Sequence, residues 1–168
     1  MAFEHLFSGS AVDSVGPGGA IALPPFIRRV MEADPGTGRI TIGAHERDPC
    51  LVAWETERAP ALLAEIERRR LRDEAIGAPA EDHHGRARLA FGFVEDGAIR
   101  DGRLIIPPMM RRKGRIADRA LFIGTGSGFE IWSPELVRAS ADPALREIAE
   151  YRLGLSAGED DIDEGGAR

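Results

Sequence analysis

The residues best suited to chemistry are arginines around one glycine turn and just after it. Arg100 and Arg103 flank the dipeptide Asp101-Gly102. A guanidinium can make bidentate contacts with a guanine edge or a phosphate. Residues 87–140 hold nine basic and six acidic side chains, net +3, in a chain of formal net charge −6. Because charges act over about 8–10 Å at physiological salt, this local patch can bind a phosphate backbone despite the overall charge. The further basic residues in it are Arg111, Arg112, Lys113 and Arg115.

Structural roles for the same arginines stay open beside DNA contact. The run that begins at Arg111 stands at the end of a predicted short helix, where cations stabilise the negative end of the helix dipole. Arg103 stands near Asp101 and Asp96, and a surface ion pair is an ordinary role for such an arginine.

The remaining candidate motifs predict structure rather than catalysis. Gly124–Gly128 lacks the Lys-Ser/Thr of a phosphate-binding loop and joins two predicted strands, so we expect a hairpin turn. Asp82-His83-His84 offers too few ligands for zinc, which takes three or four. Cys50 is the single cysteine, which excludes an internal disulfide and favours a buried apolar role. No Ser/His/Asp or Cys/His combination stands out, so we expect no enzyme, no metal and no cofactor.

The elements that carry these residues form an internal repeat. Gly19–Arg29 aligns with Gly102–Arg112, and Leu51–Trp54 aligns with Phe129–Trp132 in the same order, which indicates duplicated units. Each unit is predicted to form a strand, a turn, a short strand, a short helix and two further strands. The predicted segments are Leu6–Val12, Ala20–Leu23, Phe26–Met31, Arg39–Gly43 and Cys50–Trp54 in the first unit, and Ala87–Glu95, Arg103–Ile106, Pro108–Lys113, Ala120–Gly124 and Phe129–Trp132 in the second.

The rest of the chain predicts helices and a charged end. Thr56–Ile76 carries a helical apolar stripe through Leu62, Leu63 and Ile66, and five acids between residues 159 and 164 predict a solvated segment. No apolar run approaches the roughly 20 residues of a membrane span, and the N-terminus lacks the features of a signal peptide, so we expect a cytoplasmic protein without membrane contact. We predict a first unit at 1–55, a helical linker at 56–86, a second unit at 87–138, a C-terminal helix at 139–155 and an acidic mobile tail at 156–168.

The phrase Gly102-Arg103-Leu104-Ile105-Ile106-Pro107, together with Ile131-Trp132-Ser133 and the duplication, resembles the MraZ family over roughly residues 3–138. The resemblance implies a mainly β fold with α (α+β), in which two AbrB-like (SpoVT/AbrB) units form an interlaced double-split β-barrel with longer helices after each unit. It also implies a ring-forming homo-oligomer, associated with the nucleoid, that regulates transcription of the division and cell-wall gene cluster. Its partner would be double-stranded DNA carrying short promoter repeats, contacted by the basic turn of each unit.

The first unit departs from the family's turn motif more than the second does. Arg103 matches the arginine of the family's Gly-Arg step, and Arg100 lies where it can reach the same groove. Gly19-Ala20 replaces that step in the first unit, and Gly16 replaces the motif's aspartate, as Ile99 does in the second unit. We therefore expect DNA contact through the second unit's turn. The alternative is a ring-forming scaffold or protein-interaction protein that has lost DNA binding.

Overall fold

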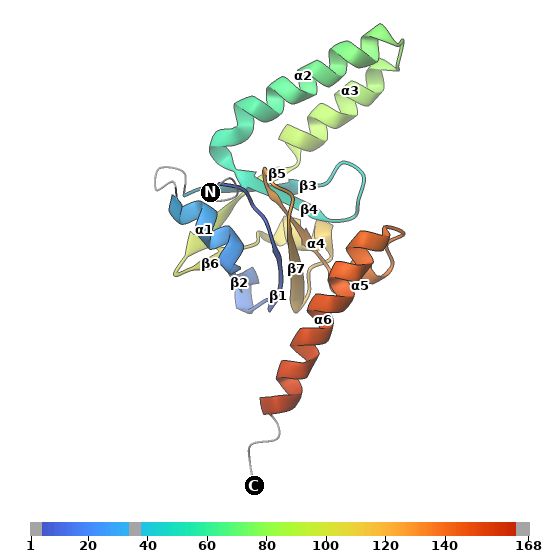
Figure 1. Cartoon of the computed structure of the whole chain (residues 1–168). Coiled ribbons are helices and arrows are strands. Elements are labelled where there is room, and N and C mark those ends of the chain that lie inside the picture. Colours follow the sequence, from blue (N-terminus) through green and yellow to red (C-terminus); the bar gives the residue numbers. More distant parts are fainter. Residues whose placement is uncertain (1–4, 34–37, 164–168) are drawn as a thin grey trace.

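Eight antiparallel strands form one nearly closed barrel in the computed structural model, which describes residues 5–33 and 38–163, with side chains as far as Gly154 (Figure 1). The strands run in the order β1-β7-β8-β4-β3-β5-β6-β2. Their bounds are β1 Ser10–Ser14, β2 Ala20–Ala22, β3 Ile40–Ala44, β4 Leu51–Glu55, β5 Val94–Arg100, β6 Arg103–Ile105, β7 Arg119–Gly124 and β8 Phe129–Trp132.

Pairs of strands from the two halves of the chain alternate around this barrel. β1 pairs with β7, β2 with β6, β3 with β5 and β4 with β8. Between β1 and β2, the Gly16 N–H donates to the Ala20 carbonyl over 2.7 Å. If β1 and β2 are counted as neighbours, the eight strands form a closed circular order. Exchanging each strand of β1–β4 with its counterpart in β5–β8 leaves this order unchanged, so the two halves of the chain occupy equivalent positions in the barrel. The predicted α+β fold with an interlaced barrel is confirmed.

The barrel interior holds the main core. Every second side chain of a strand faces the interior, and the inward positions are mostly apolar. The fully buried residues include Ile40, Ile42, Leu104, Phe122 and Ile131. Removing such a side chain from water stabilises the fold by about 1.5–3 kcal/mol. Two short helices close the barrel, α1 Pro25–Ala33 and α4 Pro108–Gly114, and each begins at a proline that needs no hydrogen-bond partner there.

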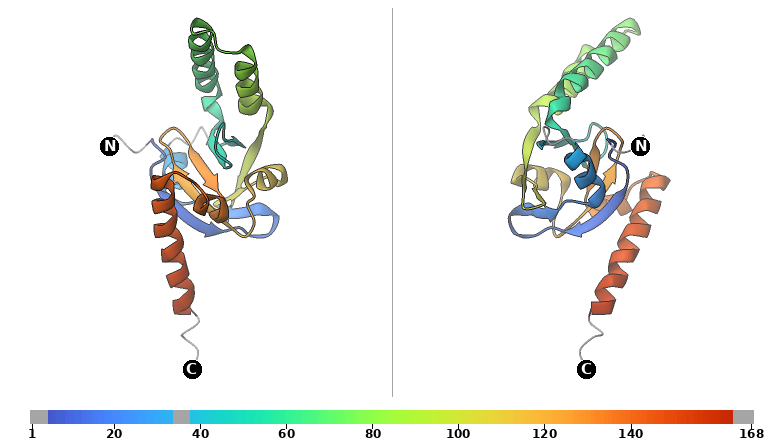
Figure 2. Two further views of the ribbon diagram at one scale, coloured as in Figure 1. Left: turned by 90° about the vertical axis from the view of Figure 1, so that its right-hand side faces the viewer. Right: turned by 60° about the vertical axis from the view of Figure 1, so that its left-hand side comes forward.

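A second apolar cluster lies outside the barrel, under the C-terminal helices α5 (Pro134–Arg138) and α6 (Pro143–Asp163). Trp132 is buried there against Leu145, Ala149 and Leu153 of α6. Past this contact α6 projects away from the barrel (Figure 2). The helix therefore continues beyond the predicted limit at residue 155. It includes residues 156–163 of the predicted tail, and the rest of that tail lies outside the described residues.

A helical hairpin projects from the opposite end of the barrel (Figures 1 and 2). The short turn Thr56–Arg58 leads into α2 (Ala59–Ala75), and α3 (Ala80–Ala87) leads through a π-helical turn, Arg88–Gly92, into β5. Among the described side chains of α2, only Ile66 is buried. No helix in the described part of the chain is long and apolar enough to cross a membrane.

Two predicted strands need correction. Ala87–Glu95 was expected to be a strand, but the helix extends through Gly92 and β5 begins at Val94, where pairing with β3 begins. Before that point no partner strand is available, and the run of Ala, Arg and Leu continues the helix. Leu6–Val12 was also expected to be a strand, but β1 begins at Ser10, and Phe7 makes only an isolated bridge.

Candidate nucleic-acid interface

The turn between β5 and β6 is a two-residue hairpin. Asp101 and Gly102 have φ angles of +52° and +71°, the combination for which Asp-Gly is favoured. Arg100 and Arg103 are register partners on the two strands, so two like charges lie directly opposite each other. Such a pair is destabilising unless an anion offsets the repulsion. The chain thus holds two exposed cations at the end of a narrow β-ribbon.

Neither arginine of this turn is neutralised within the described residues. Asp96 is one of the two acids proposed as an ion-pair partner of Arg103. Its Oδ2 instead lies 3.4 Å from Arg39 Nη2. No side-chain hydrogen bond or ion pair joins the guanidinium of Arg100 or Arg103 to another described residue. The surface ion-pair role predicted as the alternative for Arg103 is therefore absent from this part of the chain. Both guanidinium groups are available to an outside anion.

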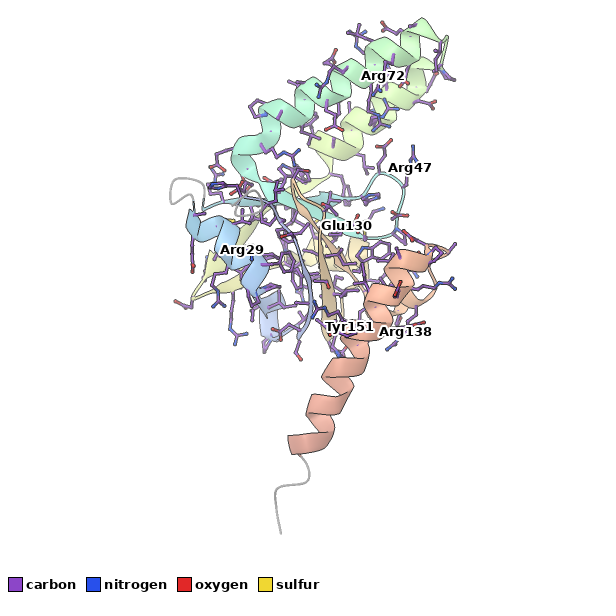
Figure 3. The ribbon with its side chains drawn as sticks, in the orientation of Figure 1. Arg29, Arg47, Arg72, Glu130, Arg138 and Tyr151 are labelled. Atoms are coloured by element: carbon purple, nitrogen blue, oxygen red, sulfur yellow. The ribbon has the colours of Figure 1, made fainter. Side chains whose placement is uncertain are left out.

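Helix α1 from the first half of the chain lies beside the β5–β6 turn. The Leu23 N–H donates to the Gly102 carbonyl over 3.0 Å, and Arg28 Nη2 donates to the Leu23 carbonyl over 3.3 Å. Arg29, the next residue on the same helix, is exposed, and its Nη2 donates to Ser8 Oγ over 3.2 Å (Figure 3). Of these two arginines of the first half, Arg28 is the one linked to the turn of the second half.

Sequence reasoning missed Arg28 as a neighbour of that turn. The internal alignment pairs Arg28 with Arg111, and that signal was visible. What the alignment could not give is which turn each helix lies beside, because this follows from the interlaced strand pairing.

The matching turn of the first half, residues 16–19, lies beside α4. The Ile106 N–H donates to the Gly19 carbonyl over 3.0 Å, the counterpart of the bond from Leu23 to Gly102. A Cβ built on Gly19 would lie 2.8 Å from Arg111 Nε, so the Arg111 side chain crosses directly over this glycine. That Nε is buried and has no hydrogen-bond partner among the described residues.

The predicted site residues therefore form two groups rather than one. Arg100 and Arg103 lie at the β5–β6 turn, whereas Arg111 lies at the turn of the first half. The other members of the second group are exposed and surround the end of α4: Arg112, Lys113 and Arg115. Lys113 Nζ also lies 5.6 Å from the centroid of the Phe93 ring. Because Arg111, Arg112 and Lys113 fall in the last turn of α4, the helix-dipole role predicted for them also fits their position.

The other motifs have structural roles. Gly124–Gly128 turns the chain between β7 and β8, where the Thr125 N–H donates to the Gly128 carbonyl over 2.9 Å. His83 and His84 lie on α3, and no group of three metal-ligating side chains occurs among the residues that the structure describes. Burial raises the pKa of the Cys50 thiol, which therefore stays protonated at neutral pH.

Comparison with known proteins identifies the family. No family model matches the chain. The transcriptional regulator MraZ of Saccharophagus degradans is 30% identical over 139 residues, which cover 80% of this chain and 87% of that protein. The chain belongs to the MraZ family. The MraZ regulator of Oleidesulfovibrio alaskensis is likewise 30% identical over 134 residues, covering 79% and 84% of the two chains. That of Gluconacetobacter diazotrophicus is 26% identical over 149 residues, covering 86% and 90%. The resemblance seen at Gly102–Pro107 is thereby confirmed.

Proposed function

We propose that this MraZ-family chain is a transcriptional regulator that binds double-stranded DNA mainly through the β5–β6 turn. The observation that carries the proposal is the pair Arg100 and Arg103, two exposed cations held opposite each other without an acidic partner among the described residues. A DNA phosphate backbone supplies the anion that this pair lacks. The family's other members named above are transcriptional regulators, and such proteins act at promoters.

The shape of the turn suits reading of bases as well as binding of phosphates. A two-stranded β-ribbon fits the major groove of B-DNA, and a two-residue turn makes its tip narrow. Arg103 would contact a guanine edge, while Arg28 of α1 would bind a flanking phosphate. Phosphate contacts fix the register of the ribbon, and the contact to the base edge provides the sequence preference.

Assembly would supply the affinity that one turn lacks. Leu63, Leu71 and Ile76 on or just after α2 are 50%, 57% and 81% exposed, and we propose that the apolar side chains of this helix contact a second copy of the chain. Contacts between unlike faces of successive copies can close into a ring. A ring would present several β5–β6 turns to short repeats in a promoter, and linked weak sites multiply their affinities. The regulated genes would be those of the division and cell-wall cluster, and the protein would be associated with the nucleoid.

A gel shift with the DNA upstream of the protein's own gene cluster tests the proposal, with a scrambled fragment of equal length as the control. We expect specific retardation that weakens steeply with salt, because each phosphate contact contributes about 0.9 to the salt slope. Equal binding of both fragments would refute sequence reading. No binding of either fragment at low salt would refute the regulator proposal.

The scaffold alternative is favoured by one observation, the absence of a basic residue in the Gly16–Ala20 turn. Light scattering separates the two functions when it is combined with the gel shift. A mass well above a dimer with DNA binding supports the regulator, and the same mass without DNA binding supports the scaffold. A monomer at micromolar concentration would contradict both, since a single basic turn would bind weakly.

A further inference from the structure

A cavity of about 340 Å³ lies where the α2–α3 hairpin meets the barrel. Its walls come from the ends of β3 and β4, the turn between β7 and β8, and the facing sides of the hairpin. This volume is at the lower end of the range, about 300–1,000 Å³, that small-molecule sites occupy. The cavity is separate from the β5–β6 turn, and the DNA-binding proposal makes no use of it.

One part of the cavity wall is apolar. Val52 and Phe129 contribute from the barrel, and Leu62 and Leu89 contribute from the hairpin. Because these side chains come from two separate bodies, a molecule lying between them would contact both the barrel and the hairpin. An apolar body fits this part of the cavity, since it would remove the partly exposed Val52, Leu62 and Leu89 from water.

The other part of the wall is cationic. Arg58, Arg69 and Arg86 line the cavity together with two carboxylates, Glu46 and Glu65. Glu46 receives hydrogen bonds from Arg69 at 2.7 and 3.0 Å and from Arg86 at 3.3 Å. The Arg69 guanidinium accordingly lowers the pKa of Glu46, which stays ionised.

The three guanidinium groups keep donors to spare. Each carries five N–H donors. Arg86 donates one hydrogen bond from Nε to Glu46 and one from Nη1 to Asp73 over 3.0 Å. Arg58 donates one from Nη1 to the Ser127 carbonyl. The side chains of Arg69 and Arg86 are 27% and 13% exposed, so their spare donors are partly removed from water. With Asp73 counted beside Glu46 and Glu65, the three cations face three carboxylates, so an anion would be held by the spare N–H donors rather than by an excess of charge.

We propose that this cavity binds a small amphipathic anion, with an apolar body against Leu62, Leu89 and Phe129 and one carboxylate or phosphate group against the arginines. The ligand contacts both the barrel and the hairpin, so its binding stabilises the packing of the hairpin against the barrel. Because it binds the folded protein, it also raises the melting temperature by mass action.

Displacement of a fluorescent probe from the full-length protein tests the charge requirement. The probe is 8-anilinonaphthalene-1-sulfonate, an aromatic anion, and the competitors are octanoate and 1-octanol, which share an alkyl chain and differ in charge. We expect octanoate to displace the probe at about tenfold lower concentration than 1-octanol, the effect of one charge-assisted hydrogen bond. Arg58→Gln should remove most of this difference. Equal displacement by the two competitors in the parent protein would overturn the proposal.

A matched pair of substitutions tests the location. Ala90→Phe fills the cavity from the π-helical turn, whereas Ala64→Phe adds the same ring to an exposed position of α2. We expect Ala90→Phe to abolish octanoate-sensitive probe binding and Ala64→Phe to leave it unchanged. Circular dichroism confirms that both variants are folded. Octanoate-sensitive binding that persists in a folded Ala90→Phe variant would overturn the proposal. If that variant does not fold, the response of Arg58→Gln to octanoate decides.

Discussion

The turns at residues 16–19 and 100–103 occupy matching positions in the two halves of the barrel, yet they present different surfaces. One backbone bond of the same kind holds each turn: Ile106 N–H donates to Gly19 and Leu23 N–H donates to Gly102, both over 3.0 Å. Above Gly19 lies the Arg111 side chain, whereas no heavy atom lies within 4 Å of a Cβ built on Gly102. The first turn is covered by protein at Gly19, although Pro17 and Gly18 stay exposed, and the second is open to an outside partner at the matching Gly102.

This difference shows that the position of a turn in the fold and the surface that it presents are determined separately. The interlaced strand pairing and the two matching hydrogen bonds fix where each turn lies. The side chains beside it then decide what the turn contacts. Where Arg100 and Arg103 are present the turn is left exposed, and where Gly19-Ala20 stands instead an arginine from α4 packs over the backbone.

The largest expected effect is on stability, from alanine at the two matching glycines. Gly19 and Gly102 have φ angles of +84° and +71°, so alanine costs about 1–2 kcal/mol of conformational energy at either position. At Gly19 the new Cβ would also lie 2.6 Å from the Ile106 carbonyl oxygen, and such overlap adds about 1–3 kcal/mol. We expect Gly19→Ala to lower the melting temperature clearly more than Gly102→Ala. Equal losses would mean that the first turn is as open as the second.

The next effect is on DNA affinity and comes from Arg103→Ala. A bidentate contact to a base contributes about 1–3 kcal/mol of discrimination, so this variant should bind the operator about tenfold more weakly and lose sequence preference. Arg100→Ala should weaken binding less, and both variants should keep or slightly raise the parent melting temperature, because each removes the repulsion between the paired arginines. Competition gel shifts against a scrambled fragment measure the preference. If Arg103→Ala binds as tightly as the parent, the β5–β6 turn does not read DNA.

Much of the fold could be predicted from local sequence. Pro25 and Pro108 mark the starts of the two short helices, and Gly77-Ala78-Pro79 ends the long one, because proline and glycine act on the backbone of their own neighbourhood. The Asp101-Gly102 hairpin follows from two adjacent residues in the same way. Leu6–Val12 and Ala87–Glu95 are exceptions, and in the second the strand begins only at Val94 because its partner β3 comes from a distant part of the chain.

The composition of the site could be predicted only in part, for the same reason. Arg103 was found from its own turn, but its neighbour Arg28 is brought there by the pairing of β2 with β6. Arg111 was grouped with Arg103 because the two are close in sequence, and the fold instead places it over Gly19. Residues that meet through long-range pairing leave no local signal of their meeting.

The third prediction compares Arg28 on α1 with Arg111 on α4, which align with each other in the internal repeat. Arg28→Ala should weaken DNA binding by about threefold to tenfold and lower the salt slope by about one, because it removes a phosphate contact beside the open turn. Arg111→Ala should affect DNA binding less, since the Arg111 side chain packs against Gly19 with its Nε buried. Fluorescence anisotropy at several salt concentrations measures both quantities. A larger loss of affinity for Arg111→Ala would assign DNA contact to the first turn and the end of α4.

The smallest expected effect is a gain, from Ala20→Arg. Ala20 aligns with Arg103 and pairs with Ile105 on β6, so the substitution restores the Gly-Arg step at the first turn without disturbing a buried core position. The neighbouring Arg111 repels the new charge, so we expect affinity for DNA to rise only about twofold to threefold, with the salt slope larger by about one. Ala20→Gln is the control, because it lengthens the side chain without adding charge. An unchanged affinity and salt slope would mean that the first turn faces away from the duplex, so that the two turns differ in direction as well as in charge.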